Sequence, residues 1–490
     1  MIYSLVTSRV YLVRAALTAG AGALILSCTS LSLRRVEEFA DITAEGDYAA
    51  GIEQIRSSKQ LYGDRNAFLY FLDIGILFHY AGEFDSSLHY LGRAEQVLDD
   101  LYARSITNEA ASLLTNDNLR PYRSRRYERI LLHQFLSFNY LARGELDESL
   151  VETRKVQLVF ESYAEKDKGK SKYREDGMSH FLSAMVYTAR SERDNAAISL
   201  FKSVRAYRDG PIELPGMVRD LAYHELMEAG REDDVKLLGL TPGASKNEIT
   251  GLDDDRSEIV LVGYAGKSPI LDEQVFWGTY VVDGLLVIHY RDPRGDMVTA
   301  TFSAPPLPEV EREKREGEEK DKVKSGSTFH IKFALPTAVR RHSETSHFAV
   351  GVDSAPSHRT EVLTNTDLLL EKDLEDNWNA ILLRTAVRVV LRTIAAQKAK
   401  REMATESPVA NLLINVGTDA LSSQLEKADT RMCFLLPQTV QLARIPVEPG
   451  SHRVTAQARG RSGEILDSKT WEAVEIRPGD TKFLFFPSVR

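Results

Sequence analysis

Between about Phe68 and Ala206 the apolar residues recur every three or four positions, which predicts a series of amphipathic helices. The clearest stretch runs from Leu72 to Ala94. A glycine there lets two helices lie close together, an aromatic residue fills the contact one turn later, and a second glycine turns the chain. The residues at these spacings are Gly75, Phe78, Gly82, Phe84, Ser87, Leu91 and Ala94. The pattern is typical of a tetratricopeptide-type helix hairpin.

The same pattern recurs more weakly along the helical region. It predicts turns at Gly46, Gly82, Gly144, Ser191 and Gly230. Only the first spacing is close to the ~34 residues of a regular array. The longer ones carry polar insertions, which we expect to be loops, at Ser105–Arg126 and Glu161–Asp176. The alternative interpretation is a generic helical bundle.

Helix hairpins of this kind bury their apolar sides against their neighbours and leave a concave surface free for a partner. Alignment of the clearest hairpin with the repeat pattern places Leu72, Ile76, His79 and Tyr80 on the inner side of its first helix. The equivalent positions in later hairpins are Gln134, Phe138 and Thr188. These seven side chains are the predicted partner-binding residues.

The pattern changes after Asp209-Gly210-Pro211 and one further hairpin that ends near Leu240. Alternating apolar and polar residues then predict strands. The expected strands are Glu258–Tyr264, Met297–Phe302 and Thr328–Ala334, with a hairpin over Thr279–Tyr290 that turns at Asp283-Gly284. Between them, Glu309–Lys324 is almost entirely charged, which favours a solvated loop or short exposed helix.

Two helices are expected next, a long one over Thr366–Arg401 and a second over Leu412–Lys427. Arg384, Arg388 and Arg392 recur every fourth residue and therefore share one side of the long helix. This stripe is a weak candidate for anion or partner binding, and a solvated or salt-bridged side is the favoured interpretation.

Four alternating runs follow, separated by Pro-Gly and Ser-Gly pairs that predict turns. They are Val440–Val447, His452–Gln457, Thr470–Ile476 and Lys482–Phe486. The predicted fold is therefore a multidomain α+β protein. Residues 1–27 are a lipoprotein signal peptide, 28–245 a tetratricopeptide-like helical domain, 250–430 a mixed α+β domain with the long helix, and 431–490 a small antiparallel β unit.

The N-terminal segment predicts the cellular location. Arg9 and Arg14 precede the uncharged apolar run Ala15–Ser27, which is typical of a signal peptide. The run ends at Cys28 in a sequence like a bacterial lipobox, although Leu26 is bulkier than the usual residue there. Cys28 is thus the predicted lipidation site, and an ordinary signal peptide or N-terminal anchor is the alternative. Thr29, rather than Asp, follows and favours the outer membrane, facing the periplasm.

Composition narrows the function classes. The chain has 490 residues, a net charge of −9 and only two cysteines, Cys28 and Cys433. The negative charge argues against general nucleic-acid binding, which needs a basic surface to neutralise phosphates. Lipidation of Cys28 would leave no internal disulfide, so Cys433 is interpreted as a buried small hydrophobic residue.

Motifs for catalysis are incomplete wherever they occur. The segment that ends at Lys267-Ser268 lacks the first glycine of a phosphate loop, and Pro269 follows where a helix should begin. His224 and Glu228 lack the second histidine of a zinc protease motif. We therefore predict no enzyme activity, no cofactor and no metal site.

Several segments, in the same order over nearly the whole mature chain, resemble a widespread family of uncharacterised bacterial outer-membrane lipoproteins with tetratricopeptide repeats. The segments that carry the resemblance are Tyr127-Glu128-Arg129, Phe138–Gly144, Leu150–Arg154, Phe333–Pro336, Arg384 with Arg388, Ala428–Arg431, Leu435–Pro437 and Val440–Arg444. Members often accompany small lipoproteins that activate peptidoglycan synthases, so the resemblance implies a role in the cell envelope and supplies no catalytic residue. This chain differs at Ser137 and Ser149, which occupy small-residue repeat positions, and in the charged loop Glu309–Lys324.

Two functions follow as expectations. The first is a lipid-anchored periplasmic scaffold that binds another envelope protein or peptide through the helical groove, with a possible link to peptidoglycan or envelope assembly. The alternative is a glycan- or anion-binding module, or an enzyme, in the β-rich C-terminal half.

Overall fold

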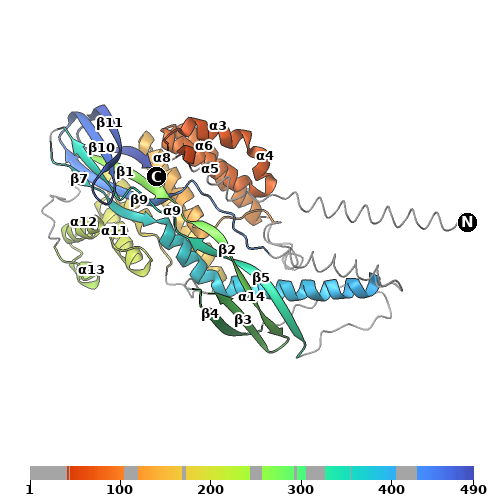
Figure 1. Ribbon diagram of the computed structural model, residues 1–490. Helices are drawn as coiled ribbons and strands as arrows, with labels where there is room; N and C mark the ends of the chain where they lie inside the picture. Colours follow the sequence, from red (N-terminus) through yellow and green to blue (C-terminus); the bar gives the residue numbers. More distant parts are fainter. Residues whose placement is uncertain are drawn as a thin grey trace, which may run out of the picture.

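The computed structural model describes residues 41–43, 45–103, 120–167, 173–242, 257–291, 295–304, 326–353, 355–403 and 427–490. The chain is an α+β protein whose helices precede its sheets (Figure 1). Cys28, the charged segment Glu309–Lys324 and the helix expected from Leu412 lie outside the described residues.

The helical half begins with α3 (Tyr48–Ser57) and α4 (Lys59–Tyr62) and continues as antiparallel pairs. These are α5 (Ala67–Ala81) with α6 (Phe84–Ala103), α8 (Arg126–Arg143) with α9 (Leu146–Asp167), α10 (Gly177–Ala189) with α11 (Arg193–Asp209), and α12 (Gly216–Glu228) with α13 (Glu232–Leu237). Helix α9 thus extends into the stretch from Glu161 that was expected to be a loop.

The predicted turn residues all have a left-handed backbone. Gly46, Gly82, Gly144 and Gly230 have positive φ angles, and Ser191 has a φ of 57°. A left-handed residue after the last helical turn lets the backbone bond back to the helix and reverse direction. At the end of α5, for example, the Gly82 N–H donates to the His79 carbonyl at 3.0 Å. The turn predictions are therefore confirmed.

The first hairpin is held by a close approach of its two helices. A Cβ atom on Gly75 would lie 2.5 Å from the Leu91 side chain, and the Ser87 hydroxyl donates to the Gly75 carbonyl at 2.7 Å. In the second hairpin the corresponding contact joins the hydroxyls of Ser137 and Ser149 at 2.8 Å. The small residues that the sequence places at these positions therefore sit at the points where the helices touch.

Two four-stranded sheets pack face to face beside the helices. The first has the order β12 (Thr481–Ser488), β1 (Ser257–Lys267), β9 (Pro437–Val447), β8 (Glu361–Asn365), and β12 runs parallel to β1. The second has the order β11 (Ile465–Ile476), β10 (Gly450–Arg459), β6 (His347–Val352), β7 (His358–Arg359).

The first sheet is covered on both sides. Ile259 and Leu261 of β1 point into the core between the two sheets, with Phe348 of β6. Val260 and Tyr264 point the other way, into the core shared with the helices. Coverage of both faces explains why β1 is a nearly continuous apolar run rather than an alternating one. Helices and two sheets thus form three layers.

The third sheet extends away from these layers (Figure 1). Its order is β4 (Met297–Ser303), β3 (Leu285–Arg291), β2 (Ile270–Val281), β5 (Thr328–Val339), and every pair is antiparallel. One face packs against the long helix α14 (Thr366–Met403). The predicted strands, the long helix and the turn at Asp283-Gly284 are confirmed.

The C-terminal strands do not form a separate antiparallel unit, so that domain prediction is wrong. β9 and β12 flank β1, and β10 pairs with β6. Their apolar side chains are buried only because strands from both parts of the chain share the same two sheets.

Candidate partner-binding surfaces

Most of the predicted partner-binding residues are buried inside the chain. Leu72 and Ile76 are 0% exposed, His79, Gln134 and Phe138 1%, and Tyr80 5%. The ring centroids of Tyr80 and Tyr264 lie 5.3 Å apart, and those of Phe138 and Phe485 5.8 Å apart. The inner side of the helices therefore contacts β1 and β12. The expectation of a free concave surface is wrong, because the chain covers that surface with its own sheet.

Gln134 and Thr188 form hydrogen bonds within the chain. The Gln134 amide donates to the Asp176 carboxylate at 2.7 Å, which ties α8 to the start of α10. Thr188 is half-buried, and its hydroxyl donates to the Ala184 carbonyl at 2.9 Å. The structure therefore gathers His79, Tyr80 and Phe138 at one junction but not Thr188.

His79 is the centre of a hydrogen-bonded chain across this junction. The Asn139 amide nitrogen donates to Ser87 at 2.8 Å, so its oxygen accepts from His79 Nδ1 at 2.6 Å. Nε2 then accepts from the Tyr264 hydroxyl at 2.7 Å. Burial lowers the pKa of His79 to about 4, so the ring is neutral at pH 7. This histidine is a link between helices and sheet rather than an exposed contact residue.

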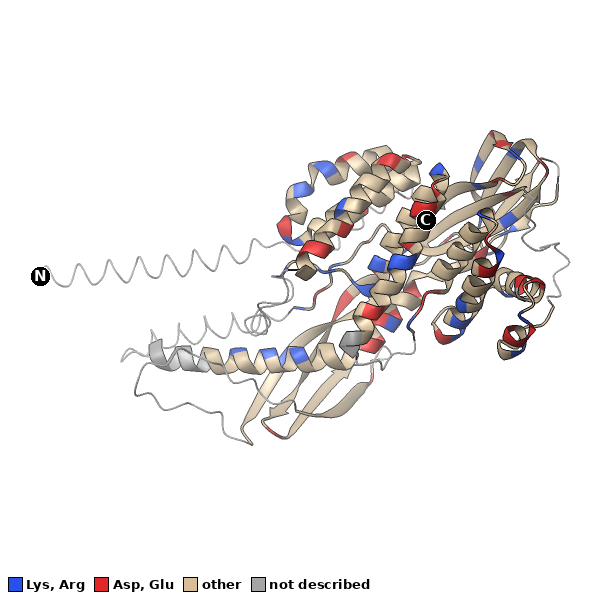
Figure 2. Ribbon diagram, turned by 180° about the vertical axis from the view of Figure 1, so that it is seen from behind, with Lys and Arg blue, Asp and Glu red and all other residues tan. Residues whose placement is uncertain are grey.

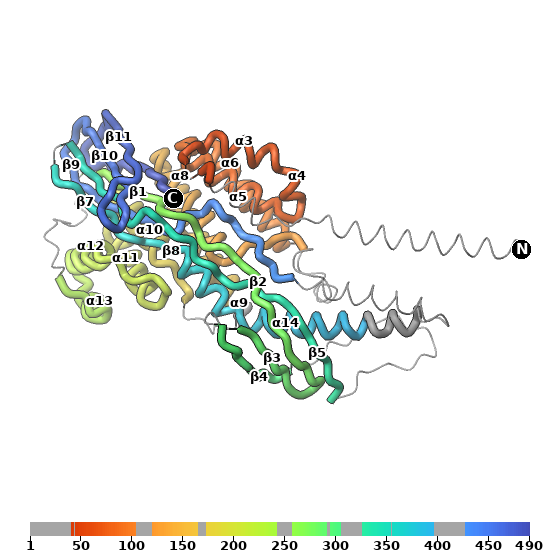
Figure 3. The backbone as a smooth tube through the Cα atoms, in the orientation of Figure 1, coloured from red at the N-terminus to blue at the C-terminus, as the bar shows by residue number. Residues whose placement is uncertain are grey.

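The segment 427–436, which forms neither helix nor strand, runs into the helical half (Figure 3). The Cys433 N–H donates to Glu128 at 2.7 Å, the Tyr80 hydroxyl donates to the Leu435 carbonyl at 3.2 Å, and Arg125 donates to the Asp429 carbonyl at 2.9 Å. All five side chains from Met432 to Leu436 are buried. This segment occupies the kind of position that a peptide ligand was expected to take.

A buried acid holds the centre of the segment. Asp73 accepts hydrogen bonds from the Cys433 thiol at 3.0 Å and from the Tyr62 hydroxyl at 2.8 Å. Burial raises the pKa of Asp73 to about 7, although both hydrogen bonds act against the rise. Burial also raises the pKa of the Cys433 thiol, which suits the predicted structural role and leaves the sulfur a poor nucleophile.

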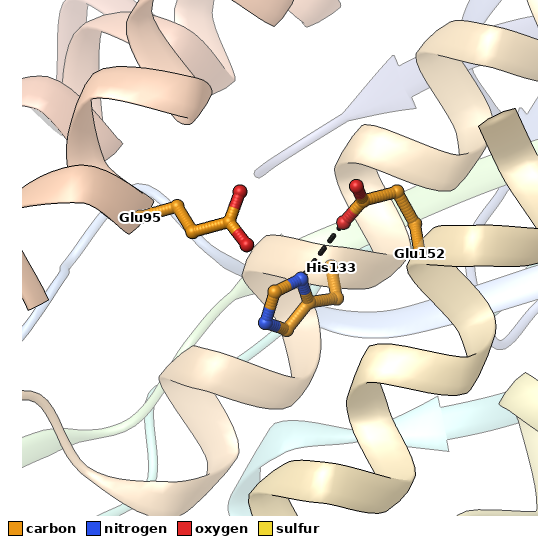
Figure 4. Close-up of side chains that lie close together, drawn as sticks. All are labelled: Glu95, His133 and Glu152. Atoms are coloured by element: carbon orange, nitrogen blue, oxygen red, sulfur yellow. Dashed lines mark hydrogen bonds and ion pairs between the residues drawn. The ribbon is translucent and has the colours of Figure 1, made fainter. Parts of the chain in front are cut away.

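Glu95, His133 and Glu152 form a cluster with the residue types of a metal site (Figure 4). His133 Nδ1 lies 2.8 Å from Glu152. Lys155 Nζ, however, donates to Glu95 at 2.7 Å and to Glu152 at 2.9 Å. Burial tends to raise the pKa of Glu152, but the hydrogen bonds from His133 and Lys155 outweigh it and lower the pKa. Because the lysine already balances the carboxylates, the cluster joins α6, α8 and α9 as an ion-pair network.

The arginine stripe on α14 is not one continuous surface. Arg384 is exposed, Arg388 is only 2% exposed and Arg392 is half-buried. The adjoining side of the helix, including Leu382, packs on the third sheet. The favoured prediction was a solvated or salt-bridged side, and of these two only solvation is excluded at Arg388, because that side chain is buried.

The third sheet has one face that α14 does not cover, and we call it the open face. Successive side chains of a strand point to opposite sides of the sheet, and on each of these strands every second side chain packs toward α14. The open face consists of the others. These are the odd-numbered residues of β2 from 275, the odd-numbered residues of β3 and β4, and the even-numbered residues of β5 up to 334. Trp277 near its centre is 39% exposed. The sequence predicted these strands but gave no indication that they form a surface.

In the part of the chain that the structure describes, no helix has the length and apolar character needed to cross a membrane. Both signs of charge are distributed along the helices, whereas the strands of the third sheet carry few charged residues (Figure 2). No protein-family model and no curated protein matches this chain.

Proposed function

We propose that the protein is a lipid-anchored scaffold of the bacterial outer membrane, which faces the periplasm and binds another cell-envelope protein. The apolar run before Cys28 supports the anchor. Acyl chains on that cysteine contribute about 0.8 kcal/mol per buried methylene, so several chains would hold the protein firmly on the membrane.

The helical half supports the scaffold role. Its antiparallel pairs, left-handed turn residues and small residues at helix contacts support a tetratricopeptide-like arrangement. Arrays of this kind serve as rigid supports for protein–protein contacts. Here the inner side binds the chain's own segment 427–436 and its own sheet, so a partner has to use another surface.

One observation carries the proposal most directly. The polar junctions among the described residues link parts of the chain to one another, as His79, Asp73 and Lys155 do, while the open face of the third sheet presents apolar and aromatic side chains to solvent. Exposed apolar surface that is gathered on one face marks an interaction site more often than scattered apolar residues do.

The test is crosslinking in living cells, followed by recovery of the protein from the membrane fraction. We expect the complete protein to fractionate with the outer membrane and to retain an envelope protein. The Cys28→Ala variant should leave the membrane fraction. A variant that stays in the membrane would contradict the anchor, and a lipidated chain that retains no protein would contradict the scaffold function. Variants at His79 or Tyr80 are unsuitable here, because these side chains are buried.

A further inference from the structure

We propose that the open face of the third sheet binds an acidic segment of the partner protein that also carries apolar side chains, with Trp277 as its central anchor. This inference rests on the proposed scaffold function and assigns the surface and the chemistry of the partner.

The position of Trp277 is the first argument. It lies on β2, an interior strand, directly opposite His289 of β3 and Lys332 of β5. His289 is in turn opposite Thr299 of β4, and its Nδ1 lies 2.8 Å from that hydroxyl. Side chains directly opposite on antiparallel strands have Cβ atoms about 4.5–5.5 Å apart. A continuous row from Lys332 to Thr299 therefore crosses all four strands, with the indole in its middle.

The apolar content of the face is the second argument. Val275 is 43% exposed, Trp277 39%, Leu285 51% and Met297 50%, and all four belong to the open face. Single exposed apolar residues are ordinary, but several on one flat face leave an area whose burial would be favourable. Tryptophan is enriched among the residues that dominate binding at protein interfaces, usually near the centre and within a polar surround.

Charge is the third argument, and it defines the partner. Lys332 and Arg291 are the cations of the open face, and neither forms an ion pair within the part of the chain that the structure describes. Glu273 is exposed on the same side of β2, two residues before Val275, so one acid borders the two cations. The protein as a whole has a net charge of −9. A face of the opposite sign on an acidic protein favours an acidic partner over basic or neutral ones.

The shape of the face favours a polypeptide over a small molecule or sugar. Small ligands bind mainly in concave pockets that enclose most of their surface. The open face is the exposed side of a sheet, with the hydroxyls of Thr279, Thr299 and Thr301 around the tryptophan. Such a mixture of one aromatic anchor, short polar side chains and two cations suits a peptide segment with carboxylates and apolar groups.

The test is selection from a displayed library of random peptides on the complete secreted chain that carries Cys28→Ala. We expect the enriched peptides to combine Asp or Glu with apolar residues. Trp277→Ala should weaken their binding at least about tenfold. Lys332→Glu should shift the selected sequences toward basic residues. Arg453→Glu is the matched control, because Arg453 is exposed on β10 of another sheet, and it should leave the selection unchanged.

Several outcomes would overturn the proposal. One is that the unmodified face enriches no peptides beyond those that the Trp277→Ala variant enriches. Another is that the enriched peptides are neutral or basic. A third is that Lys332→Glu leaves the selected sequences unchanged. Binding of soluble peptidoglycan fragments that is lost with Trp277→Ala would assign the face to a glycan instead. Self-association in sedimentation velocity that Trp277→Ala abolishes would assign it to a second copy of the chain. Failure of the lipid anchor would appear only in the membrane fractionation, so the two proposals fail separately.

Discussion

At the scale of single residues, the most informative side chains are polar groups that the fold buries. His79 is 1% exposed and bonds to Asn139 and Tyr264, while Asp73 is 0% exposed and bonds to Tyr62 and Cys433. Both are placed where helices meet parts of the chain from the C-terminal half. Their bonds require particular partners, so they select one arrangement of the two halves more sharply than apolar contacts would.

Burial of neutral His79 makes stability depend on pH. Its pKa is about 4 in the folded chain and 6.5 ordinarily, so between these values the unfolded chain binds one more proton. Its contribution to the free energy of unfolding therefore falls as the pH decreases through this range. Asp73 acts in the opposite direction. Its pKa is about 7 in the folded chain and 3.8 ordinarily, so its contribution to the free energy of unfolding declines as the pH rises from 3.8 to about 7.

We expect the His79→Gln variant to isolate the effect of His79 on the pH dependence of stability, because Asp73 contributes equally to the variant and to the unmodified chain. The difference in free energy of unfolding between the unmodified chain and His79→Gln should be about 2 kcal/mol smaller at pH 5 than at pH 7. Urea unfolding at the two pH values measures it. An equal difference at both would show that His79 is not buried in its neutral form.

At the scale of elements, the helix hairpins and strands are well encoded in local sequence. Turn residues such as Gly82 need only their own backbone conformation, and alternation along β4 or the periodicity of α14 follows from neighbours in the sequence. The partners of the strands are not local. β12 lies parallel to β1 although Thr481 and Glu258 are 223 residues apart. The sequence of neither segment indicates that the two strands pair.

The close contact in the first hairpin gives a prediction with an internal control. Gly75→Ala should lower the free energy of unfolding by about 1–3 kcal/mol, because the new methyl group would lie 2.5 Å from Leu91. Gly92→Ala on the paired helix has open space around it and should raise stability by up to about 1 kcal/mol, since alanine favours the helix. Thermal or urea unfolding of both variants measures the effects. Similar effects of the two substitutions would contradict the close packing.

The candidate site was only partly predictable for a physical reason. Apolar residues such as Tyr80 and Phe138 have the same spacing along a helix whether they face a partner protein or another part of the same chain. The unbroken apolar run Met432–Leu436 was the available signal, because five consecutive apolar residues are more typical of a segment buried on all sides. The open face was missed because the sequence gives the alternation of a strand but not which side a helix covers.

At the scale of the whole molecule, the helices and the first sheet share one hydrophobic core. Tyr264 and Phe485 from the sheet fill the inner side of the helices, and the segment 427–436 passes through the same core. Burial of one large apolar side chain contributes about 1.5–3 kcal/mol, so many such contacts between the halves are comparable with the stability of a typical domain.

We therefore expect residues 28–245 not to fold alone into the structure they have here. The fragment should melt at a lower temperature than the complete chain, or without a cooperative transition, and should bind a hydrophobic dye because its inner side is uncovered. Circular dichroism and dye fluorescence, with the complete secreted chain as control, test this. Cooperative melting at the temperature of the complete chain would show that the helices form an independent domain.

The parallel pairing of β12 with β1 has a consequence for the order of events during biosynthesis. Phe485 of β12 reaches the aromatic rings beside His79, and the ring centroids of these two residues lie 5.0 Å apart. A ribosome makes the helices before this strand, so those rings stay unshielded until β12 has been synthesised. Contacts between distant parts of a sequence also slow folding. Chains truncated before β12 would therefore leave these rings uncovered, and we expect proteases to degrade them faster than chains that contain β12.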